Sequence, residues 1–447
     1  MDTIILAGGF GTRLWPSSRK TYPKQFLTLH SEKTLIKETI ERIQNIRANN
    51  KIIVSVNKNY NFLVESIIDQ NNENIEIVTE PISKNTLPAI MLAIRYLKDK
   101  HKASRTNIVF ISPSDHIIES LEKFSKTILK AEEAAKKGFI VTLGIIPNRV
   151  ETDYGYIEKG DKIENNIYLT KSFVEKPPYD KAKQFIETGG YYWNSGMFIF
   201  PIWLFEEELE KYEKEMFSFY SLGYEKLYEK FHLLPSISID YAIMEKTTKA
   251  ATIETDIMWS DIGSWDSLYE TLKKDDDENV IIGDALAYNI KRTLIYNKTS
   301  KRVIVGTNIN DLIIVDTDDV LLVAKKGSSQ SIKGIVNDLD INKSGLTTHH
   351  LKTYRSWGNY KVLDKDESFK VERIEVYKDE ELSLQFDEYI AKQWTIVVGI
   401  GEITIDDKII KRSDNDTIFI PNRSKHRIKN IGDNTLIFIE IQYCDCL

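Results

Sequence analysis

The sequence contains little cysteine and has no long apolar run. Its 447 residues include two cysteines, Cys444 and Cys446, both near the end of the chain. Cysteines placed there cannot staple a core, so a disulfide-stabilised fold is excluded and a reducing, cytoplasmic location is expected. No apolar stretch approaches the ~20 residues that a membrane-spanning helix needs. Residues 1–3 also lack the basic-then-apolar pattern of a signal peptide, so we expect no membrane association.

An excess of positive charge is missing as well. The chain carries 60 Lys and Arg residues against 67 Asp and Glu residues, which gives a net charge of -7. We therefore expect no nucleic-acid partner, although single basic loops are compatible with this balance. The apolar fraction of 42% is that of an ordinary globular protein. The length predicts two or three domains.

Strands and helices alternate up to about residue 150. Five apolar runs have the length and the β-branched content of buried parallel strands: TIILA, KIIVSV, IEIVTE, NIVFIS and FIVTLGII. Segments with helical spacing separate them, such as TLIKETIERIQNI and LPAIMLAIRYLKD. This alternation predicts a doubly wound, Rossmann-like α/β domain, in which ligands bind beyond the carboxyl ends of the strands.

The rest of the chain changes character twice. An aromatic-rich stretch, GGYYWNSGMFIF, lies in the second half of the first domain, which we place at 1–270. Short strands dominate a β-rich connecting segment, 271–335, and a polar segment, 336–352, is typical of a linker. Residues 353–447 are again short strands with turn signals, which predicts a small all-β sandwich or barrel.

A glycine-rich turn, GGFGTR at 8–13, directly follows the first strand. A dinucleotide-binding loop requires a small residue where this sequence has Leu14, and a Walker A loop requires Gly-Lys-Ser/Thr, which is missing. The third alternative is a phosphate-binding loop, in which backbone N–H groups act together with Arg13 and Lys24 on a triphosphate. The glycines alone do not distinguish such a site from a simple turn.

The wider context of this turn carries a family resemblance. LAGGFGTRLWPSSRKTYPKQF, at 6–26, closely resembles the opening motif of the sugar-1-phosphate nucleotidyltransferases, and in particular of the long bacterial mannose-1-phosphate guanylyltransferases. Further motifs of that family follow in order: EPISKNTLPAI (80–90), SPSDH (112–116), ETDYGYI (151–157), FVEKP (173–177), WNSGMF (193–198), SISIDYAIMEKT (236–247) and WSDIGSW (259–265). From YRSWGNYKVL onward, the chain resembles the cupin-like mannose-6-phosphate isomerase domain that many members carry.

The resemblance implies attack of a sugar 1-phosphate on the α-phosphate of a nucleoside triphosphate, with release of pyrophosphate. The nucleophile is already an anion at neutral pH, so positioning and charge stabilisation suffice without a general base. By resemblance, the catalytic residues are Arg13, Lys24 and Lys176, which act on the phosphates. Asp115 and Asp261 are expected to bind Mg²⁺, because hard carboxylate oxygens suit that cation.

Contacts to the nucleotide and the sugar are carried over in the same way. The expected nucleotide-binding residues are Leu6, Gly8, Gly9, Gly11, Thr12, Glu80, Asn85, Thr86 and Ser114. The expected sugar-binding residues are Gly155, Glu175 and Asn194. Glu80 favours GTP, because one carboxylate can accept hydrogen bonds from both N1–H and N2–H₂ of guanine.

Some positions depart from the family pattern. Phe10 stands where the family usually has a small or polar residue, Lys84 where it has arginine, and Asp153 where it has glycine. Lys84 keeps the charge but loses the bidentate fork of arginine. Asp153 adds a carboxylate beside the expected sugar site, so we expect it to affect the choice of sugar.

The C-terminal domain departs further from its family. Relatives hold a divalent metal there, mostly with histidines. Here the residues DEY at 387–389 replace the consecutive histidines, Lys392 and Gln393 replace a Glu-His pair, and His426 survives. On one strand, Asp387 and Glu388 would point to opposite faces and could not both enter the barrel. We therefore expect a retained scaffold that has lost its metal site and serves packing or dimerisation.

Together these features predict an enzyme that transfers GMP from GTP to mannose 1-phosphate, giving GDP-mannose for polysaccharide biosynthesis, and that acts as a cytoplasmic homodimer. Three alternatives stay open: a guanylyltransferase for another sugar 1-phosphate, a bifunctional enzyme that keeps isomerase activity, and a non-catalytic sugar-nucleotide sensor. The intact set Arg13, Lys24, Asp115 and Asp261 argues against the sensor.

Overall fold

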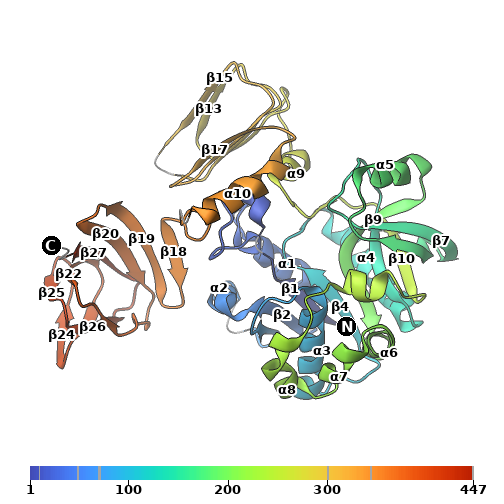
Figure 1. The fold of residues 1–447 in the computed structure, drawn as a ribbon, viewed down its shortest axis with the longest axis horizontal. Coiled ribbons are helices and arrows are strands. Elements are labelled where there is room, and N and C mark those ends of the chain that lie inside the picture. Colours follow the sequence, from blue (N-terminus) through green and yellow to red (C-terminus); the bar gives the residue numbers. More distant parts are fainter. Residues whose placement is uncertain (10, 48–49, 69–71, 300–301, 343–344, 445–447) are drawn as a thin grey trace. The chain divides into compact units, whose positions relative to one another are not determined.

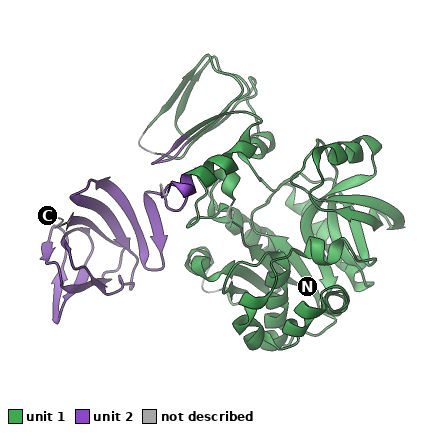
Figure 2. Ribbon diagram, in the orientation of Figure 1, with its two compact units in different colours: residues 1–315, 322–338 green, residues 316–321, 339–447 purple. Residues whose placement is uncertain are grey.

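Figure 1 shows the computed structural model of the chain, which describes residues 1–9, 11–47, 50–68, 72–299, 302–342 and 345–444. Phe10 and Cys446 lie outside the described residues. The chain divides into two compact units, residues 1–315 with 322–338 and residues 316–321 with 339–447 (Figure 2). Within the described ranges, no helix is long and apolar enough to cross a membrane.

The first unit is built on a nine-stranded sheet with the strand order β3-β2-β1-β4-β9-β6-β10-β8-β7. Its strands are β1 (Asp2–Ala7), β2 (Ile52–Asn57), β3 (Ile75–Glu80), β4 (Ile108–Pro113), β6 (Ile140–Ile145), β7 (Tyr156–Glu164), β8 (Ile167–Val174), β9 (Tyr191–Pro201) and β10 (Ala250–Thr255). β1 is parallel to both β2 and β4, and β2 is parallel to β3. The carboxyl ends of these four strands therefore meet at one edge of the sheet.

β9 separates the fifth apolar run from the other four. It lies between β4 and β6 and runs antiparallel to both, while β6 is parallel to β10. β9 is the aromatic-rich stretch, and most of its side chains are buried. A strand that is buried on both faces has the same apolar pattern whatever its direction, so the sequence did not reveal this insertion.

Helices cover both faces of this sheet. The helices of this unit that precede the short-strand segment are α1 (Leu35–Gln44), α2 (Asn61–Glu65), α3 (Thr86–His101), α4 (Leu121–Lys136), α5 (Tyr179–Thr188), α6 (Ile202–Tyr212), α7 (Lys214–Tyr220), α8 (Tyr224–Glu229) and α9 (Trp265–Thr271). Ile4, Val109 and Ile111 share one core cluster with residues of α3. The neighbouring Phe110 instead contacts Phe124 of α4, with 6.5 Å between ring centroids. Because successive side chains of a strand point to opposite faces, α3 and α4 lie on opposite faces, which confirms the doubly wound α/β fold.

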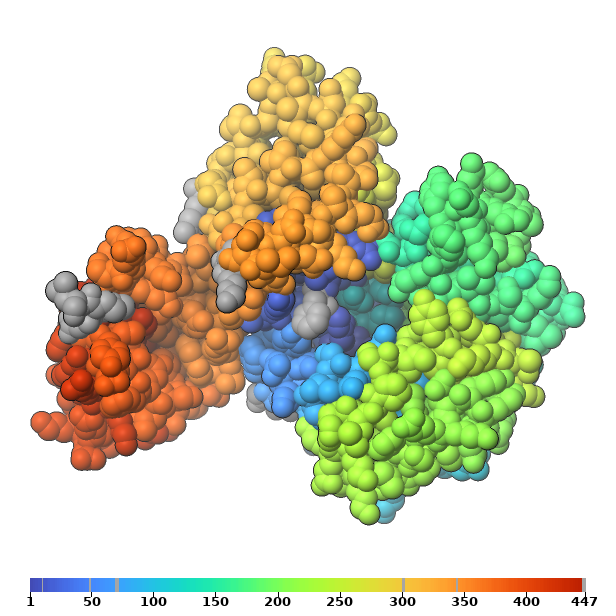
Figure 3. Space-filling model, viewed as in Figure 1, coloured from blue at the N-terminus to red at the C-terminus, as the bar shows by residue number. Residues whose placement is uncertain are grey.

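A segment of short strands follows in the chain. β12 (Val280–Ile282), β14 (Leu294–Asn297), β16 (Leu312–Asp316) and β17 (Leu321–Lys325) form one sheet, and β13 (Ala285–Tyr288) pairs with β15 (Ile304–Thr307). The pairs β12–β14 and β13–β15 are parallel, so this segment is not a series of hairpins. Helix α10 (Ile332–Ile341) lies at the surface (Figure 3) and occupies the first residues of the segment 336–352 that looked like a linker. A short pair, β5 (Ile117–Ile118) with β11 (Trp259–Ser260), belongs to the first unit.

The second unit consists of two antiparallel sheets, with the orders β18-β19-β20-β27-β22-β25 and β21-β26-β23-β24. The strands are β18 (Lys352–Arg355), β19 (Gly358–Lys365), β20 (Phe369–Val376), β21 (Gln385–Phe386), β22 (Ile390–Val398), β23 (Gly401–Ile405), β24 (Lys408–Arg412), β25 (Thr417–Ile420), β26 (Lys425–Asn430) and β27 (Leu436–Cys444). Trp394, Ile403 and Phe438 lie in the apolar core that both sheets enclose. The predicted all-β cupin-like domain is confirmed.

Candidate active site

A cavity of about 450 Å³ lies beyond the carboxyl ends of β1, β3 and β4. The predicted nucleotide-binding residues that line it are Leu6, Gly8, Gly9, Glu80, Asn85 and Thr86, and the predicted metal ligand Asp115 lines it too. Gly11, Thr12 and Ser114 are not among its lining residues. Doubly wound folds bind their ligands at the carboxyl edge of the sheet, which is where this cavity lies.

Gly11 brings the glycine-rich loop against Lys24. Its φ is 62°, and a Cβ at this position would lie 2.4 Å from the Cβ of Lys24. Both the backbone conformation and the close approach therefore require glycine. Thr12 and Arg13 follow in a short 3₁₀ turn (Thr12–Leu14), and Lys24 begins another (Lys24–Phe26).

Lys24 connects the two predicted metal ligands. Its ammonium nitrogen lies 2.7 Å from Asp115 Oδ2, and it also donates a hydrogen bond to the backbone carbonyl of Asp261. Lys24 is 6% exposed, so this charge is largely shielded from water. Burial alone would raise the pKa of Asp115, but the neighbouring charge of Lys24 holds that pKa below its usual value. Asp115 is therefore an anion at neutral pH.

Asp261 is held in place by the loop before β7. Its Oδ1 accepts hydrogen bonds from the Tyr154 hydroxyl at 2.8 Å and from the Gly263 amide at 2.9 Å. Within the described part of the chain, Asp261 Oδ2 has no hydrogen-bond partner. No group of three or more His, Cys, Asp or Glu residues is arranged to hold a metal among the described residues. Two carboxylates fit Mg²⁺ when phosphate oxygens and waters supply its other ligands, which is how this cation is commonly bound.

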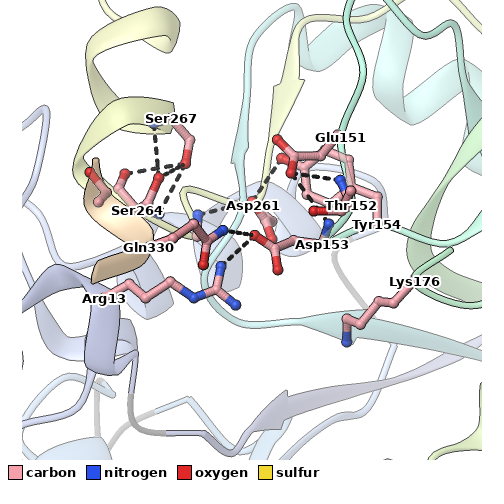
Figure 4. Close-up of polar contacts among 12 residues, drawn as sticks. Arg13, Glu151, Thr152, Asp153, Tyr154, Lys176, Asp261, Ser264, Ser267 and Gln330 are labelled. Atoms are coloured by element: carbon pink, nitrogen blue, oxygen red, sulfur yellow. Dashed lines mark hydrogen bonds and ion pairs between the residues drawn. The ribbon is translucent and has the colours of Figure 1, made fainter. Parts of the chain in front are cut away.

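Arg13 is paired with Asp153, a residue that the sequence analysis had placed beside the expected sugar site. Its Nη1 lies 2.6 Å from Asp153 Oδ2, and Gln330 Nε2 donates to the same oxygen at 2.7 Å (Figure 4). Asp153 and Gln330 come from distant parts of the sequence, since Gln330 precedes α10. The sequence analysis noticed Asp153 as a departure but did not reveal either partner.

The three predicted sugar-binding residues lie together. A Cβ at Gly155 would lie 2.5 Å from Glu175 Oε2 and 3.2 Å from the Asn194 Cβ. The backbone N–H of Asn194 donates to the Gly155 carbonyl at 2.8 Å. Asn194 Nδ2 donates to Asp240 Oδ1 at 2.9 Å, which leaves one of its two N–H groups for a sugar hydroxyl. Lys176 is exposed, with its ammonium 3.1 Å from Glu175 Oε1.

Two carboxyl groups of the site have raised pKa values. Burial raises the pKa of Glu80 to about 7, even though Ser55 Oγ donates to its Oε1 at 3.0 Å. Burial, together with the charge of Asp240, raises the pKa of Glu175 to about 7. Both groups can therefore change charge near neutral pH when a ligand binds.

Sequence reasoning missed Tyr154 and Asp240. Tyr154 is 6% exposed and positions Asp261 through its hydroxyl. Asp240 lines the 450 Å³ cavity and anchors Asn194. Both lie inside motifs that the sequence analysis recognised, ETDYGYI and SISIDYAIMEKT, so membership of a recognised motif was the available signal.

The cupin-like domain has a buried lysine in the polar cluster where the sequence analysis expected the lost metal site. Lys392 is 4% exposed, and its ammonium lies 2.6 Å from Gln385 Oε1 and 2.8 Å from Asp387 Oδ2. His426 is buried, and its Nε2 has no hydrogen-bond partner in the described structure. Asp387 and Glu388 lie in the loop between β21 and β22, so the expectation that they alternate along one strand is wrong. A cation already in place, with one histidine, does not fit a divalent metal.

Comparison with known proteins agrees with this architecture. Residues 2–278 match the family described as Nucleotidyl transferase. Residues 285–339 match the MannoseP isomerase/GMP-like beta-helix domain, and residues 342–447 match the Mannose-6-phosphate isomerase C-terminal family.

Similar proteins extend over nearly the whole chain. The alginate biosynthesis protein AlgA of Pseudomonas aeruginosa is 36% identical over 99% of this chain and 93% of its own length. The mannose-1-phosphate guanylyltransferase of Salmonella montevideo is 37% identical over 98% of this chain and 95% of its own. A crystal structure from Thermus thermophilus, described as a mannose-1-phosphate geranyltransferase, is 29% identical, covers 76% of this chain and 99% of its own, and superposes with a TM-score of 0.69. The chain therefore belongs to the nucleotidyl transferase family, among the long mannose-1-phosphate guanylyltransferases with a C-terminal isomerase-type domain, and is a nucleotidyltransferase.

Proposed function

We propose that this chain transfers GMP from GTP to mannose 1-phosphate, forming GDP-mannose and releasing pyrophosphate. The observation that carries the proposal is the convergence of Lys24, Asp115 and Asp261 beside the cavity that contains Glu80. A cation and two carboxylates at that place suit a triphosphate and its metal, and the buried carboxylate of Glu80 in the cavity wall suits guanine. The names of the relatives support mannose 1-phosphate as the acceptor.

The chain contributes charge and position rather than proton transfer. An oxygen of the sugar 1-phosphate attacks the α-phosphorus in line with the bridging oxygen, whose bond breaks as pyrophosphate leaves. Lys24 neutralises the α-phosphate oxygens, and Arg13 the β- and γ-phosphates. Mg²⁺, held by Asp115 and Asp261, would withdraw electron density from the same phosphate oxygens. Lys176 attracts the phosphate of the acceptor.

The sugar is held by Glu175, Asn194 and Asp240. The carboxylate oxygens accept from sugar hydroxyls, and the remaining side-chain N–H of Asn194 donates to one, while Asn194 Oδ1 already accepts from Thr142 Oγ1 and the Gly196 amide. The backbone of Gly155 closes over Glu175 without room for a side chain. This set explains how a polyhydroxylated ring is oriented for attack.

A pyrophosphate-release assay over a matrix of nucleoside triphosphates and sugar 1-phosphates tests the proposal. With Mg²⁺ present, GTP with mannose 1-phosphate should give the highest kcat/KM, and EDTA should abolish turnover. If another sugar 1-phosphate is the best acceptor, that sugar replaces mannose in the proposal and the reaction class stays the same. Binding of GDP-mannose without turnover of any pair would indicate a sensor and contradict the proposal. Light scattering of the same sample tests the predicted homodimer.

A further inference from the structure

Both cations that we assign to the triphosphate are already paired with carboxylates. Lys24 lies against Asp115, and Arg13 lies against Asp153. For Lys24 the exchange of partners is simple, because Asp115 is itself a proposed metal ligand and would have the Mg²⁺ that accompanies the nucleotide as its new partner. Asp153 has no such role. Its charge must be accommodated when Arg13 moves to the phosphates, since leaving a carboxylate without a partner is costly.

Gln330 is already hydrogen-bonded to Asp153, so it can remain the partner of this carboxylate after Arg13 leaves. Its Nε2 donates to the same carboxylate oxygen, Oδ2, that Arg13 contacts (Figure 4). The turn that carries Gln330 is fixed to the start of α9. Asp266 Oδ1 accepts from the Gly327 amide at 2.7 Å, and Asp266 Oδ2 accepts from the Ser329 amide at 3.0 Å. The backbone of the turn that carries Gln330 is therefore anchored independently of Arg13.

The structure also provides space for the carboxylate to move. Asp153 and Gln330 line a cavity of about 440 Å³ that adjoins Asp261. The side chains of Arg13 and Asp153 are 26% and 24% exposed, so the pair can separate without opening the core. A partly exposed ion pair of this kind is weak enough to be displaced by a polyanion.

We propose that Asp153 substitutes for the triphosphate in the nucleotide-free enzyme, where it holds Arg13 in place. When the nucleotide displaces Asp153 from Arg13, the Asp153 carboxylate stays hydrogen-bonded to Gln330. The inference rests on the proposed function, because it assigns Arg13 to the β- and γ-phosphates. Asp153 is thus a positioning residue. It precedes Tyr154, which binds Asp261, and Gly155, which contacts the sugar-site residues. Displacement of Asp153 therefore connects nucleotide binding to the loop that shapes the metal and sugar sites.

The proposal predicts opposite effects for substitutions of Asp153 and of Gln330. In Asp153→Asn the competing charge is lost, so GTP should bind more tightly, by roughly two- to five-fold. In Gln330→Ala the displaced carboxylate has no partner, so GTP should bind more weakly by a similar factor. Adding Gln330→Ala to Asp153→Asn should leave GTP affinity close to that of Asp153→Asn alone, because no displaced charge remains for Gln330 to bind. A purely structural role would weaken binding in both single variants.

The experiment is calorimetric titration of GTP into the full-length protein without sugar phosphate, followed by steady-state kinetics. Glu270→Gln is the matched control: Glu270 lines the same cavity but pairs with Lys274, so its neutralisation should leave GTP affinity unchanged. In the kinetics, KM for GTP should follow the binding change while kcat stays within about two-fold. Asp153→Ser serves as a second variant, expected to act like Asp153→Asn.

The two hypotheses fail differently. Wild-type protein that neither binds GTP nor releases pyrophosphate would overturn the proposed function. Active wild-type protein whose Asp153→Asn and Asp153→Ser variants, both folded, bind GTP no more tightly would overturn the role of Asp153 alone. Tighter binding in Gln330→Ala would also overturn it, because Gln330 would then be an obstacle and not a receiver.

Discussion

The ammonium nitrogen of Lys24 lies 2.7 Å from Asp115 Oδ2 and also donates to the backbone carbonyl of Asp261. One buried side chain thus links the glycine-rich loop, the end of β4 and the region after β11. It defines the point where the α-phosphate and its metal are proposed to lie. Substitutions of Lys24 and of Asp261 therefore test the proposed function directly.

Removing either charge at this point should nearly abolish turnover. We expect Lys24→Ala and Asp261→Ala each to lower kcat by a factor on the order of 10²–10³, because each removes an electrostatic contact to the reacting phosphate. The measurement is pyrophosphate release with GTP, Mg²⁺ and mannose 1-phosphate. Lys126→Ala is the control, since Lys126 is an exposed lysine on α4 paired with Glu122. A folded variant with near wild-type kcat would remove that residue from the catalytic set.

Glu80→Gln should lower the preference for GTP over ATP and UTP. The amide turns one acceptor into a donor, so a guanine N–H group is left without a partner at a cost of about 1–3 kcal/mol. The values of kcat/KM for the three nucleotides measure the effect. Unchanged ratios would move base recognition to the backbone or to Asn85 and Thr86.

The same carboxyl group makes GTP binding dependent on pH. Burial raises the pKa of Glu80 to about 7, and only the ionised carboxylate accepts both guanine N–H groups. As pH falls below about 7, protonation competes with binding, so the affinity for GTP should fall by up to about ten-fold per pH unit. Calorimetric titrations from pH 8 to pH 6 measure this dependence. Glu80→Gln should lack it, and a wild-type affinity that does not change over this range would show that Glu80 does not bind the base.

Gly155→Ala should impair use of the sugar. A Cβ there would lie 2.5 Å from Glu175 Oε2, so the carboxylate must move, and losing one hydrogen bond to the sugar raises KM for mannose 1-phosphate by roughly ten-fold. KM for GTP should change little. Gly334→Ala is a matched control, because nothing lies within 4 Å of its added Cβ. Equal changes in both KM values would point to general distortion of the active site.

The cupin-like domain should be independent of metal. Because Lys392 occupies the centre of its polar cluster, we expect EDTA to leave the thermal unfolding of the full chain unchanged. We also expect no interconversion of mannose 6-phosphate and fructose 6-phosphate with Zn²⁺, Co²⁺ or Mn²⁺. Metal-dependent isomerase activity would show that the carboxylates and His426 had rebuilt a site.

Replacing Lys392 should instead destabilise the chain. Lys392→Met leaves Asp387 without its cation and should cost about 1–3 kcal/mol, less than for a fully buried pair because Asp387 is partly exposed. Chemical denaturation followed by circular dichroism measures the loss. Lys378→Met is the control, since Lys378 is exposed and pairs with the exposed Asp433. Equal stability of both variants would contradict a central role for the lysine.

Much of this protein follows from local patterns in the sequence. Apolar runs separated by helical spacing were sufficient for the doubly wound domain, because burial on both faces of a sheet leaves that pattern in the chain. The residue types available to the C-terminal domain are also visible in the sequence: acidic residues stand at 387 and 388 and a lysine at 392. The glycine at position 11 belongs here too: its conformational requirement is local, although the reason for it, the contact with Lys24, is not.

Tertiary structure alone decided which residues became partners. β9 lies in the sheet between β4 and β6, and Asp387 lies in a loop and not in a strand. Asp153 contacts Arg13 and Gln330, and Tyr154 contacts Asp261, pairings that the sequence did not reveal. A local pattern records how much of a segment is buried, whereas a contact between distant residues depends on strand direction, loop path and the packing of everything between them. That is why the chemistry of the site could be anticipated from the sequence but its present pairing of charges could not.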